Sequence, residues 1–206
     1  MLKPAYPIAT PRLLLRPYAD TDLADFYAIR GQPEVCKYLM IPALDREQAR
    51  MMLELRIREQ VLVRAGEALS LAVVLPATGK VVGEAVLKWL SGEHRRGEVG
   101  YLLHPDHEGH GYATEAAAAM LRLGFEDLGL HRIVGSLDAR NVGSARVLER
   151  LGMRREACFT DCLWVKDEWV DELIYAMTER EWAAGVAGVA GAGLATSQHG
   201  AGGYLA

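Results

Sequence analysis

Cysteine is scarce in this chain, which narrows the chemistry available to it. Cys36, Cys158 and Cys162 are its three cysteines in 206 residues. An odd, small number in a chain long enough to bury a hydrophobic core predicts reduced thiols in a cytoplasmic protein, not a disulfide scaffold. The spacing of Cys158 and Cys162 invites a metal site, but the surrounding EACFTDCLWV is typical of a strand, so we predict no metal there.

Long apolar runs and an excess of positive charge are also lacking. The first residues, MLKPAYPIATPR, carry prolines and charges where a signal peptide needs an apolar core. The run AAGVAGVAGAGLA near the other end is too short to span a bilayer. The formal charge of -4 provides no broad basic surface, so we expect neither nucleic acid nor membrane as a partner. Any anionic ligand should be held locally.

The hydrophobic period changes repeatedly along the chain. The pattern predicts strands at 11–17, 68–76, 81–90, 98–105, 131–138, 153–165 and 169–177, and helices at about 20–30, 45–66, 112–128 and 141–151. Runs of strands interrupted by helices indicate an α+β or mixed α/β sheet, not a doubly wound one. We predict one domain over residues 1–182, followed by a flexible glycine- and alanine-rich tail over 183–206.

A pair of glycines precedes the third helix, in the stretch HEGHGYATEA. Gly109 and Gly111 stand where no Asp, Asn or Ser can cap the helix, and a helix N-terminus attracts phosphate through its unpaired N–H groups. The dinucleotide fingerprint is excluded because Thr114 occupies the position of its third glycine, and no P-loop lysine is present. The pattern favours a diphosphate site, with an ordinary strand-to-helix turn as the alternative.

Four stretches in order carry a family resemblance across about residues 8–182. They are TPRLLLRPYADTDLADFYAIRGQPEVCKYL, GEVGYLLHPDHEGHGYATEA, LDARNVGSARVLERLGM and KDEWVDELIYAMTEREW. The chain resembles the GNAT superfamily of acyl-CoA N-acetyltransferases, most of all the branch of Rim-type ribosomal-protein N-terminal acetyltransferases. The resemblance implies a GNAT-like mixed α/β fold. Its central, mostly antiparallel sheet would have about six or seven strands, flanked by helices, with a splayed strand pair that binds acetyl-CoA.

The resemblance also implies residues that hold acetyl-CoA. The diphosphate loop of the family falls on Glu108 to Ala113, where Glu108 is a departure, because the family usually has a neutral or basic side chain there. The expected cofactor-binding positions are Leu102, Leu103 and His104 beside the pantetheine and the oxyanion, and Gly109, His110, Gly111, Tyr112, Ala113 and Thr114 in the loop. Asn141 and Ser144 match an Asn-x-x-Ser pattern. Asn141 would bind cofactor or splayed backbone, and Ser144 would reach the sulfur or the phosphates, unless it only caps its helix.

Acetyl transfer to an amine requires the amine to lose a proton, since amine pKa values lie near 8 or above. Glu98 matches the strand glutamate that acts as general base in some relatives, and Glu84 and His94 are alternative candidates. The alternative for Glu98 is a solvated strand carboxylate. Many relatives have, at the position of Leu148, a tyrosine that acts as general acid toward the leaving CoA, so that proton donor is absent here.

The resulting prediction is an acetyl-CoA-dependent N-acetyltransferase that acts directly on a primary amine, with a protein N-terminus, a polyamine or another small amine as the acceptor. No cysteine lies in a nucleophile setting, which argues against a covalent intermediate. The alternative is a non-catalytic acyl-CoA-binding or sensor module with the same fold. We predict no metal at His104, His107 and His110, and a homodimer contact through the strand EWVDELIYAM. For Trp164 and Trp169 we predict core or hairpin packing, with an acceptor platform as the alternative.

Overall fold

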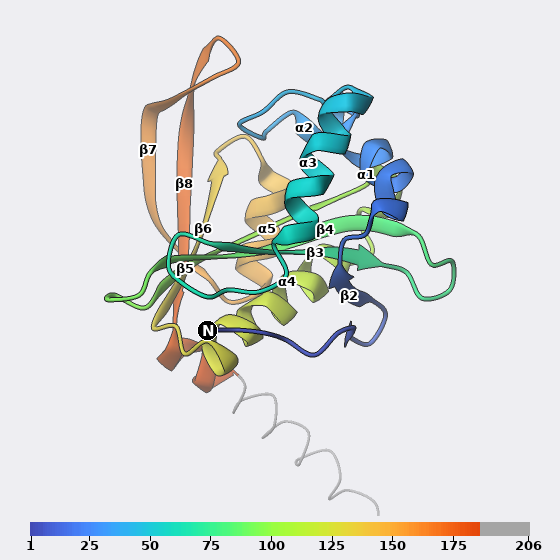
Figure 1. The fold of residues 1–206 in the computed structure, drawn as a ribbon. Coiled ribbons are helices and arrows are strands. Elements are labelled where there is room, and N and C mark those ends of the chain that lie inside the picture. Colours follow the sequence, from blue (N-terminus) through green and yellow to red (C-terminus); the bar gives the residue numbers. More distant parts are fainter. Residues whose placement is uncertain (186–206) are drawn as a thin grey trace, which may run out of the picture.

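Eight strands form one sheet in this computed structural model, which describes residues 1–185 (Figure 1). Their spatial order is β1-β2-β3-β4-β5-β6-β8-β7, and all neighbours are antiparallel except β5 and β6. The strands are β1 (Ile8–Ala9), β2 (Leu14–Pro17), β3 (Ala68–Val74), β4 (Val81–Ser91), β5 (Arg96–Leu103), β6 (Arg132–Asp138), β7 (Arg154–Val165) and β8 (Glu168–Thr178). The predicted mixed α/β class with a mostly antiparallel sheet is confirmed.

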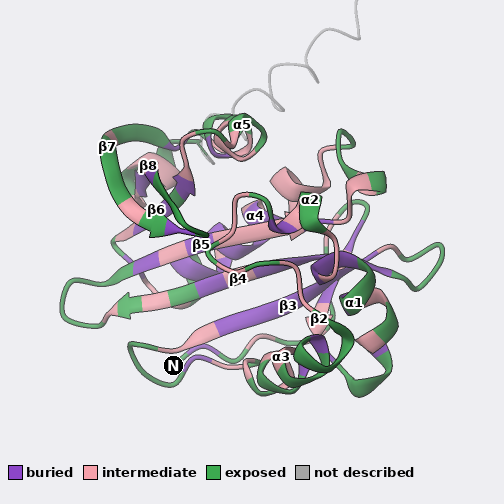
Figure 2. Ribbon diagram, turned by 90° about the horizontal axis from the view of Figure 1, so that it is seen from above, coloured by how far each residue is buried: buried purple, intermediate pink, exposed green. Residues whose placement is uncertain are grey.

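Helices cover both faces of this sheet (Figures 1 and 2). They are α1 (Leu23–Arg30), α2 (Pro33–Cys36), α3 (Arg46–Arg58), α4 (Tyr112–Arg122) and α5 (Val142–Arg150), with a π-helical turn, Leu123–Asp127, directly after α4. Two hydrophobic cores result. One contains α4 and α5 with most of the sheet, and the other contains α1 and α3.

Strand β3 contributes to both cores. Leu69, Leu71 and Val73 pack on the α4 side, while Ala72 and Val74 pack on the α1 and α3 side. Successive side chains of a strand point to opposite faces, so a strand covered on both sides needs apolar residues at consecutive positions. This requirement explains the run ALSLAVV.

Strands β5 and β6 separate after three paired residues. Their parallel pairing covers Arg96–Arg132, Gly97–Ile133 and Glu98–Val134, while β5 continues to Leu103 along β4. From Val99 onward, one edge of β5 therefore faces a gap in the sheet. This is the splayed pair that the resemblance implied.

The helix predicted over 45–66 is wrong beyond Arg58. Its start is as expected, because Asp45 and Gln48 form a reciprocal capping box. The helix ends at Arg58 because Leu62 belongs to the core that contains α4 and α5, where it is fully buried and forms a β-bridge with Leu2. The four-residue apolar period continues through Val61, which misled the sequence-based assignment.

One further expectation, the homodimer contact through EWVDELIYAM, needs correction. The strand EWVDELIYAM is β8, which lies between β6 and β7 and has no free edge. The outer strand is β7, which is exposed along most of its length (Figure 2).

The chain after β8 is helical over residues 179–185. There Trp182 stacks on Phe125 and donates to Glu126 Oε1 at 3.0 Å. Most of the predicted tail, residues 186–206, lies outside the described residues. Within residues 1–185, no helix has the length and apolar character needed to cross a membrane.

Candidate functional site

A groove of about 590 Å³ opens where the splayed edge of β5 meets the start of α4, the start of α5, and α2. Three groups of residues line it. The end of β5, the loop after it and the first turn of α4 contribute Tyr101, Leu102, Leu103, Pro105, Glu108, Gly109, Gly111, Tyr112, Ala113 and Thr114. Helix α5 and its N-cap contribute Asn141, Gly143, Ser144, Arg146, Val147 and Arg150. The segment around α2 contributes Glu34, Val35, Lys37, Tyr38 and Leu39. Most of the predicted cofactor positions thus line one groove.

The loop before α4 presents unpaired N–H groups at one end of the groove. Gly109 and Gly111 have φ values of 77° and 80°, in the left-handed region that glycine adopts without steric cost. Gly111 is the N-cap residue, and no side chain caps the helix. Within residues 1–185, the N–H groups of residues 109–114 have no hydrogen-bond acceptor, and the buried hydroxyl of Thr114 has no partner either. Such a cluster suits an anionic ligand.

The N-terminal segment holds this loop in place from outside the groove. The Glu115 carboxylate, in the first turn of α4, accepts hydrogen bonds from the Thr10 hydroxyl at 2.6 Å and from the Arg12 N–H and guanidinium, both at 2.7 Å. Arg12 also donates to the His110 carbonyl at 2.8 Å. Burial alone would raise the pKa of Glu115, but these hydrogen bonds outweigh it and hold that pKa below its usual value. Sequence reasoning missed both Arg12 and Glu115.

The backbone of β5 decides which N–H groups face the gap. The N–H of His104 donates to the Val82 carbonyl at 2.8 Å, toward β4. Successive residues of an antiparallel strand direct their N–H groups to opposite sides, so the N–H of Leu102, two residues before His104, also points to β4. Those of Tyr101 and Leu103 point into the gap. Of the three positions predicted to offer an N–H to the oxyanion, only Leu103 has its N–H directed into the gap, because the N–H groups of Leu102 and His104 point to β4.

Two hydroxyl groups meet across the groove beside this strand edge. The Tyr101 hydroxyl donates to the Ser144 carbonyl at 2.8 Å, and the Ser144 hydroxyl donates to the Tyr101 oxygen at 3.1 Å. Asn141 caps α5, because its side-chain oxygen accepts from the Ser144 N–H at 3.0 Å. The structure thus gives Asn141 a capping role, and both Asn141 and Ser144 line the groove.

Glu98 lies at the point where β5 and β6 separate. Its carboxylate forms an ion pair with Lys88 of β4 at 2.5 Å and is partly exposed. It shares a sheet face with Leu102, because both belong to the same set of alternate residues, and that face is covered by α1 and α3. Glu98 is thus at the vertex of the gap, on the face opposite α5.

The other two candidate bases are in different positions. Glu84 is only 1% exposed, and its carboxylate contacts the guanidinium groups of Arg30 and Arg56, so it balances buried charge. His94 lies in the turn between β4 and β5, at the opposite end of β5 from the glycine loop. Seven residue steps of strand separate those ends by roughly 23 Å, which places His94 away from the groove.

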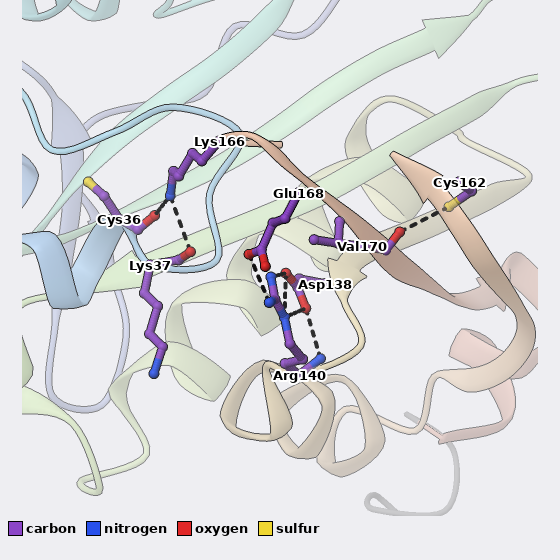
Figure 3. Close-up of polar contacts among 8 residues, drawn as sticks. All are labelled: Cys36, Lys37, Asp138, Arg140, Cys162, Lys166, Glu168 and Val170. Carbon is purple, nitrogen blue, oxygen red and sulfur yellow. Dashed lines mark hydrogen bonds and ion pairs between the residues drawn. The ribbon is translucent and has the colours of Figure 1, made fainter. Parts of the chain in front are cut away.

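The tip of the β7–β8 hairpin contacts the segment around α2 (Figure 3). The Lys166 ammonium donates to the carbonyls of Cys36, at 2.5 Å, and Lys37, at 3.2 Å. Lys166 and Asp167 have φ values of 51° and 65°, as the two-residue type I′ turn of a hairpin requires. Lys37 lines the groove, so the hairpin tip braces one of its walls.

A second contact fixes the base of that hairpin tip (Figure 3). Arg140, after β6, donates to both Asp138 oxygens and, at 2.8 Å, to Glu168 of β8. Burial alone would raise the pKa of Asp138, but the hydrogen bonds from Arg140 hold it below its usual value. The hairpin tip is therefore tied to α2 on one side and to the β6–α5 connection on the other.

The histidine and cysteine spacings do not produce a cluster in the structure. His104 and His107 contact each other edge to face, whereas His110 stacks on Tyr112. Cys158 and Cys162 are exposed on β7. In the part of the chain from 1 to 185, no group of three or more His, Cys, Asp or Glu side chains could hold a metal ion. Trp164 and Trp169 pair across the hairpin, with ring centroids 5.3 Å apart, and both are exposed, so they pack on the hairpin and not in a core.

Comparisons with known proteins agree with this geometry. Residues 12–154 match the family described as Acetyltransferase (GNAT) domain. YnaD of Bacillus subtilis (strain 168), named as an uncharacterized N-acetyltransferase, is 33% identical over 175 residues, which are 85% of this chain and 98% of YnaD.

Solved structures of acetyltransferases also resemble this chain. A GNAT-family acetyltransferase from Bacillus anthracis is 32% identical, with a TM-score of 0.76 over 84% of this chain and 99% of that one. Mycobacterium smegmatis RimJ, in complex with CoA-disulfide, is 27% identical, with a TM-score of 0.71 over 82% of this chain and 83% of that one. The chain therefore belongs to the GNAT family of acetyltransferases.

Proposed function

We propose that this acetyltransferase moves the acetyl group of acetyl-CoA directly to a primary amine. The observation that carries the proposal is the groove between the unpaired N–H groups of residues 109–114 and the open edge of β5. These two features suit acetyl-CoA, in which an amide-rich arm that ends in the thioester extends from a diphosphate. The solved RimJ relative holds a CoA derivative.

The glycine loop would hold the diphosphate. The N–H groups of Gly109, Gly111 and the first turn of α4 supply donors and a partial positive charge, and the Thr114 hydroxyl adds another donor. On the other wall of the groove, Arg146 and Arg150 of α5 supply positive charge. Glu108 lines the same groove and opposes anion binding.

The open edge of β5 would hold the pantetheine arm. An amide-bearing chain can satisfy the backbone groups of Tyr101 and Leu103 that face the gap, as an added strand would. An N–H in this position can also stabilise the oxyanion that forms at the thioester carbonyl. The amine nitrogen then bonds to the carbonyl carbon as the carbon–sulfur bond breaks, and CoA leaves.

Glu98 is the proposed general base, acting directly or through water on the incoming ammonium group. It lies at the vertex of the gap, on the face opposite α5, so the amine would approach from the α1 and α3 side. The acceptor class is a protein N-terminus, a polyamine or another small amine. In support of an amine acceptor, the Glu34 carboxylate lies at the groove end nearest α2, where Lys37 and Tyr38 also line the wall.

A binding and turnover experiment tests the proposal. Calorimetry should show acetyl-CoA binding to the wild type and at least tenfold weaker binding to Gly111→Val, where the side chain blocks backbone approach. The matched control is Gly79→Val, at another left-handed glycine, φ 68°, in the β3–β4 turn. Free-thiol release across N-terminal peptides, polyamines and small amines then measures transfer. Binding without release for any amine would favour the sensor alternative, and no binding would overturn the site assignment.

A further inference from the structure

Strand β5 contains a glycine that the packing of the protein does not require. Gly100 has the backbone of a strand, with a φ outside the left-handed region. Among residues 1–185, and apart from its chain neighbours, a methyl group at Gly100 would meet only the Val86 Cβ, at 3.9 Å, an ordinary contact. At Gly97 of the same strand, a methyl group would instead lie 2.6 Å from Leu130 Cδ1. Glycine weakens a strand interior and often marks the close approach of a ligand.

The space over Gly100 belongs to a strip of the sheet that the helices leave uncovered. Three directly opposed residue pairs of β4 and β5 share one face: Lys88 with Glu98, Val86 with Gly100, and Glu84 with Leu102. Helices α1 and α3 cover the third pair, since Leu102 packs on their core and Glu84 is buried. The other two pairs are partly or fully exposed, as β4 passes from buried to exposed along its length (Figure 2). We call these two pairs the open strip.

The open strip adjoins the place where the thioester would lie. The peptide bond after Gly100 carries the Tyr101 N–H, which faces the gap between β5 and β6. Glu98 is two residues away on the same face as Gly100, about 7 Å along the strand. A small molecule over Gly100 therefore has the gap beside it and the Glu98 carboxylate at one end.

The charges of the open strip indicate what kind of acceptor fits it. The Lys88 ammonium and the Glu98 carboxylate form an ion pair whose side chains are 50% and 24% exposed. An acceptor that brings only an ammonium group to Glu98 places two cations beside one carboxylate, and the two cations repel each other. An acceptor that also carries a carboxylate restores the balance, because the Lys88 ammonium can bind it through a charge-assisted hydrogen bond.

We infer that the open strip is an acceptor subsite for a zwitterion, a primary amine that carries its own carboxylate, as an amino acid does. Glu98 receives the ammonium group, Lys88 binds the carboxylate, and the space over Gly100 holds the carbon atoms between them. The inference rests on the proposed function and narrows its acceptor class to small amino acids. Lys88 and Gly100 determine specificity in this subsite, and the product is an N-acetylamino acid.

Gly100→Ala tests the space in the subsite. Its methyl group fits the fold, so Tm should equal or exceed that of the wild type, because alanine loses less chain entropy on folding than glycine. The KM for the amino acid should rise at least tenfold, with the Kd for acetyl-CoA unchanged. Gly92→Ala, in the β4–β5 turn, is the matched control, since its methyl group would also make one ordinary contact, at 3.8 Å with Trp89. It should leave both constants unchanged.

Lys88→Met tests the recognition of the carboxylate. Free-thiol release from acetyl-CoA is measured with α-, β- and γ-amino acids, each beside its amide, and the wild type should prefer the acids. Lys88→Met should raise KM about tenfold for the acids, as loss of a charge-assisted hydrogen bond does, and less than twofold for the amides. Comparing each acceptor with itself across variants cancels differences in amine pKa. Lys88→Arg should keep the preference, and Lys80→Met, at an exposed lysine in the β3–β4 turn, is the control.

The results distinguish failure of the subsite from failure of the proposed function. Transfer to amides, peptides or polyamines with no preference for the acids would overturn the zwitterion subsite and leave the acetyltransferase activity standing. Equal effects of Lys88→Met on acids and amides, or an unchanged amino-acid KM in Gly100→Ala, would do the same. Absence of thiol release with every amine would overturn the proposed function and the subsite together.

Discussion

Arg12 and Glu115 form a bidentate contact between the N-terminal segment and the first turn of α4. The Glu115 carboxylate accepts from the Arg12 N–H and from its guanidinium, each at 2.7 Å, although the two residues are 103 positions apart. Arg12 also binds the carbonyl of His110, inside the glycine loop. The segment before β2 therefore sets the position of the loop proposed to hold the diphosphate.

Glu115→Gln should weaken acetyl-CoA binding without unfolding the protein. The amide keeps the shape but loses the charge-assisted contacts with Arg12, so the loop loses its external support. We expect the Kd for acetyl-CoA, measured by calorimetry, to rise about fivefold to tenfold, or ~1 kcal/mol. Glu179→Gln removes a similar surface ion pair, with Arg95, and should leave the Kd unchanged. Equal Kd values for wild type and Glu115→Gln would show that the contact does not support the loop.

Glu108→Gln should strengthen acetyl-CoA binding. The side chain lines the groove beside the loop that would carry the diphosphate, and like charges a few ångströms apart repel by ~1 kcal/mol or more near a protein surface. We expect a Kd about threefold to tenfold lower at low salt, with a smaller gain at high salt because the repulsion is screened. Asp106→Asn, at an 83% exposed side chain two residues away, is the control and should have less effect. A Kd unchanged at both salt concentrations would mean that Glu108 points away from the phosphates.

Glu98→Gln should lower turnover while leaving acetyl-CoA affinity close to that of the wild type. Loss of a general base typically costs about 10²- to 10⁴-fold, and the kcat profile should also lose its acidic limb. Lys88→Met is the companion variant, since it removes the partner in the ion pair but keeps the carboxylate. Full activity of Glu98→Gln across the pH range would assign proton removal to water or to another residue.

How much of this site could be predicted from sequence differs from residue to residue. The start of α4 and the absence of a side-chain cap there were predictable, because the two glycines and the missing capping residue are local features. The contact between Arg12 and Glu115 was not, because nothing local marks a partner 103 positions away. The exclusion of the His104 N–H depends on the register between β4 and β5, which a single sequence does not encode in readable form.

In the fold, too, local features could be predicted from sequence and features set by tertiary contacts could not. The apolar run of β3 predicted its strand correctly, and the capping box at Asp45 predicted the start of α3 correctly. The end of α3 depends on Leu62 pairing with Leu2, a tertiary contact that overrides a continuing helical period. The internal position of β8 is likewise a property of sheet order, and no pattern within EWVDELIYAM reveals it.

Lys166→Met should loosen the segment around α2 and leave the diphosphate end of the groove intact. The ammonium binds two carbonyls, of Cys36 and Lys37, and charge-assisted bonds of this kind are stronger than neutral ones. Hydrogen exchange over residues 33–39 should become about tenfold faster, with acetyl-CoA affinity unchanged and KM for the amine raised. Lys80→Met, at an exposed lysine in the β3–β4 turn, is the control. Unaltered exchange at 33–39 would rule out a bracing role for the hairpin tip.

The stability of the chain at acidic pH should depend in part on Glu181. Hydrogen bonds from Arg154 and then from the Thr178 N–H and hydroxyl lower the pKa of Glu181 from its usual 4.5 to about 2. A carboxylate whose pKa is lower in the folded state stabilises the fold above its unfolded pKa, and that contribution is lost as the pH falls through the folded pKa. The difference in Tm between wild type and Glu181→Gln, measured by calorimetry, should therefore be constant above about pH 5 and shrink between pH 4.5 and 2. Glu93→Gln, at an exposed residue in the β4–β5 turn, should show no such trend. A Tm difference that stays constant down to pH 2 would contradict a lowered pKa at Glu181 and leave only the loss of hydrogen-bond geometry to explain the variant.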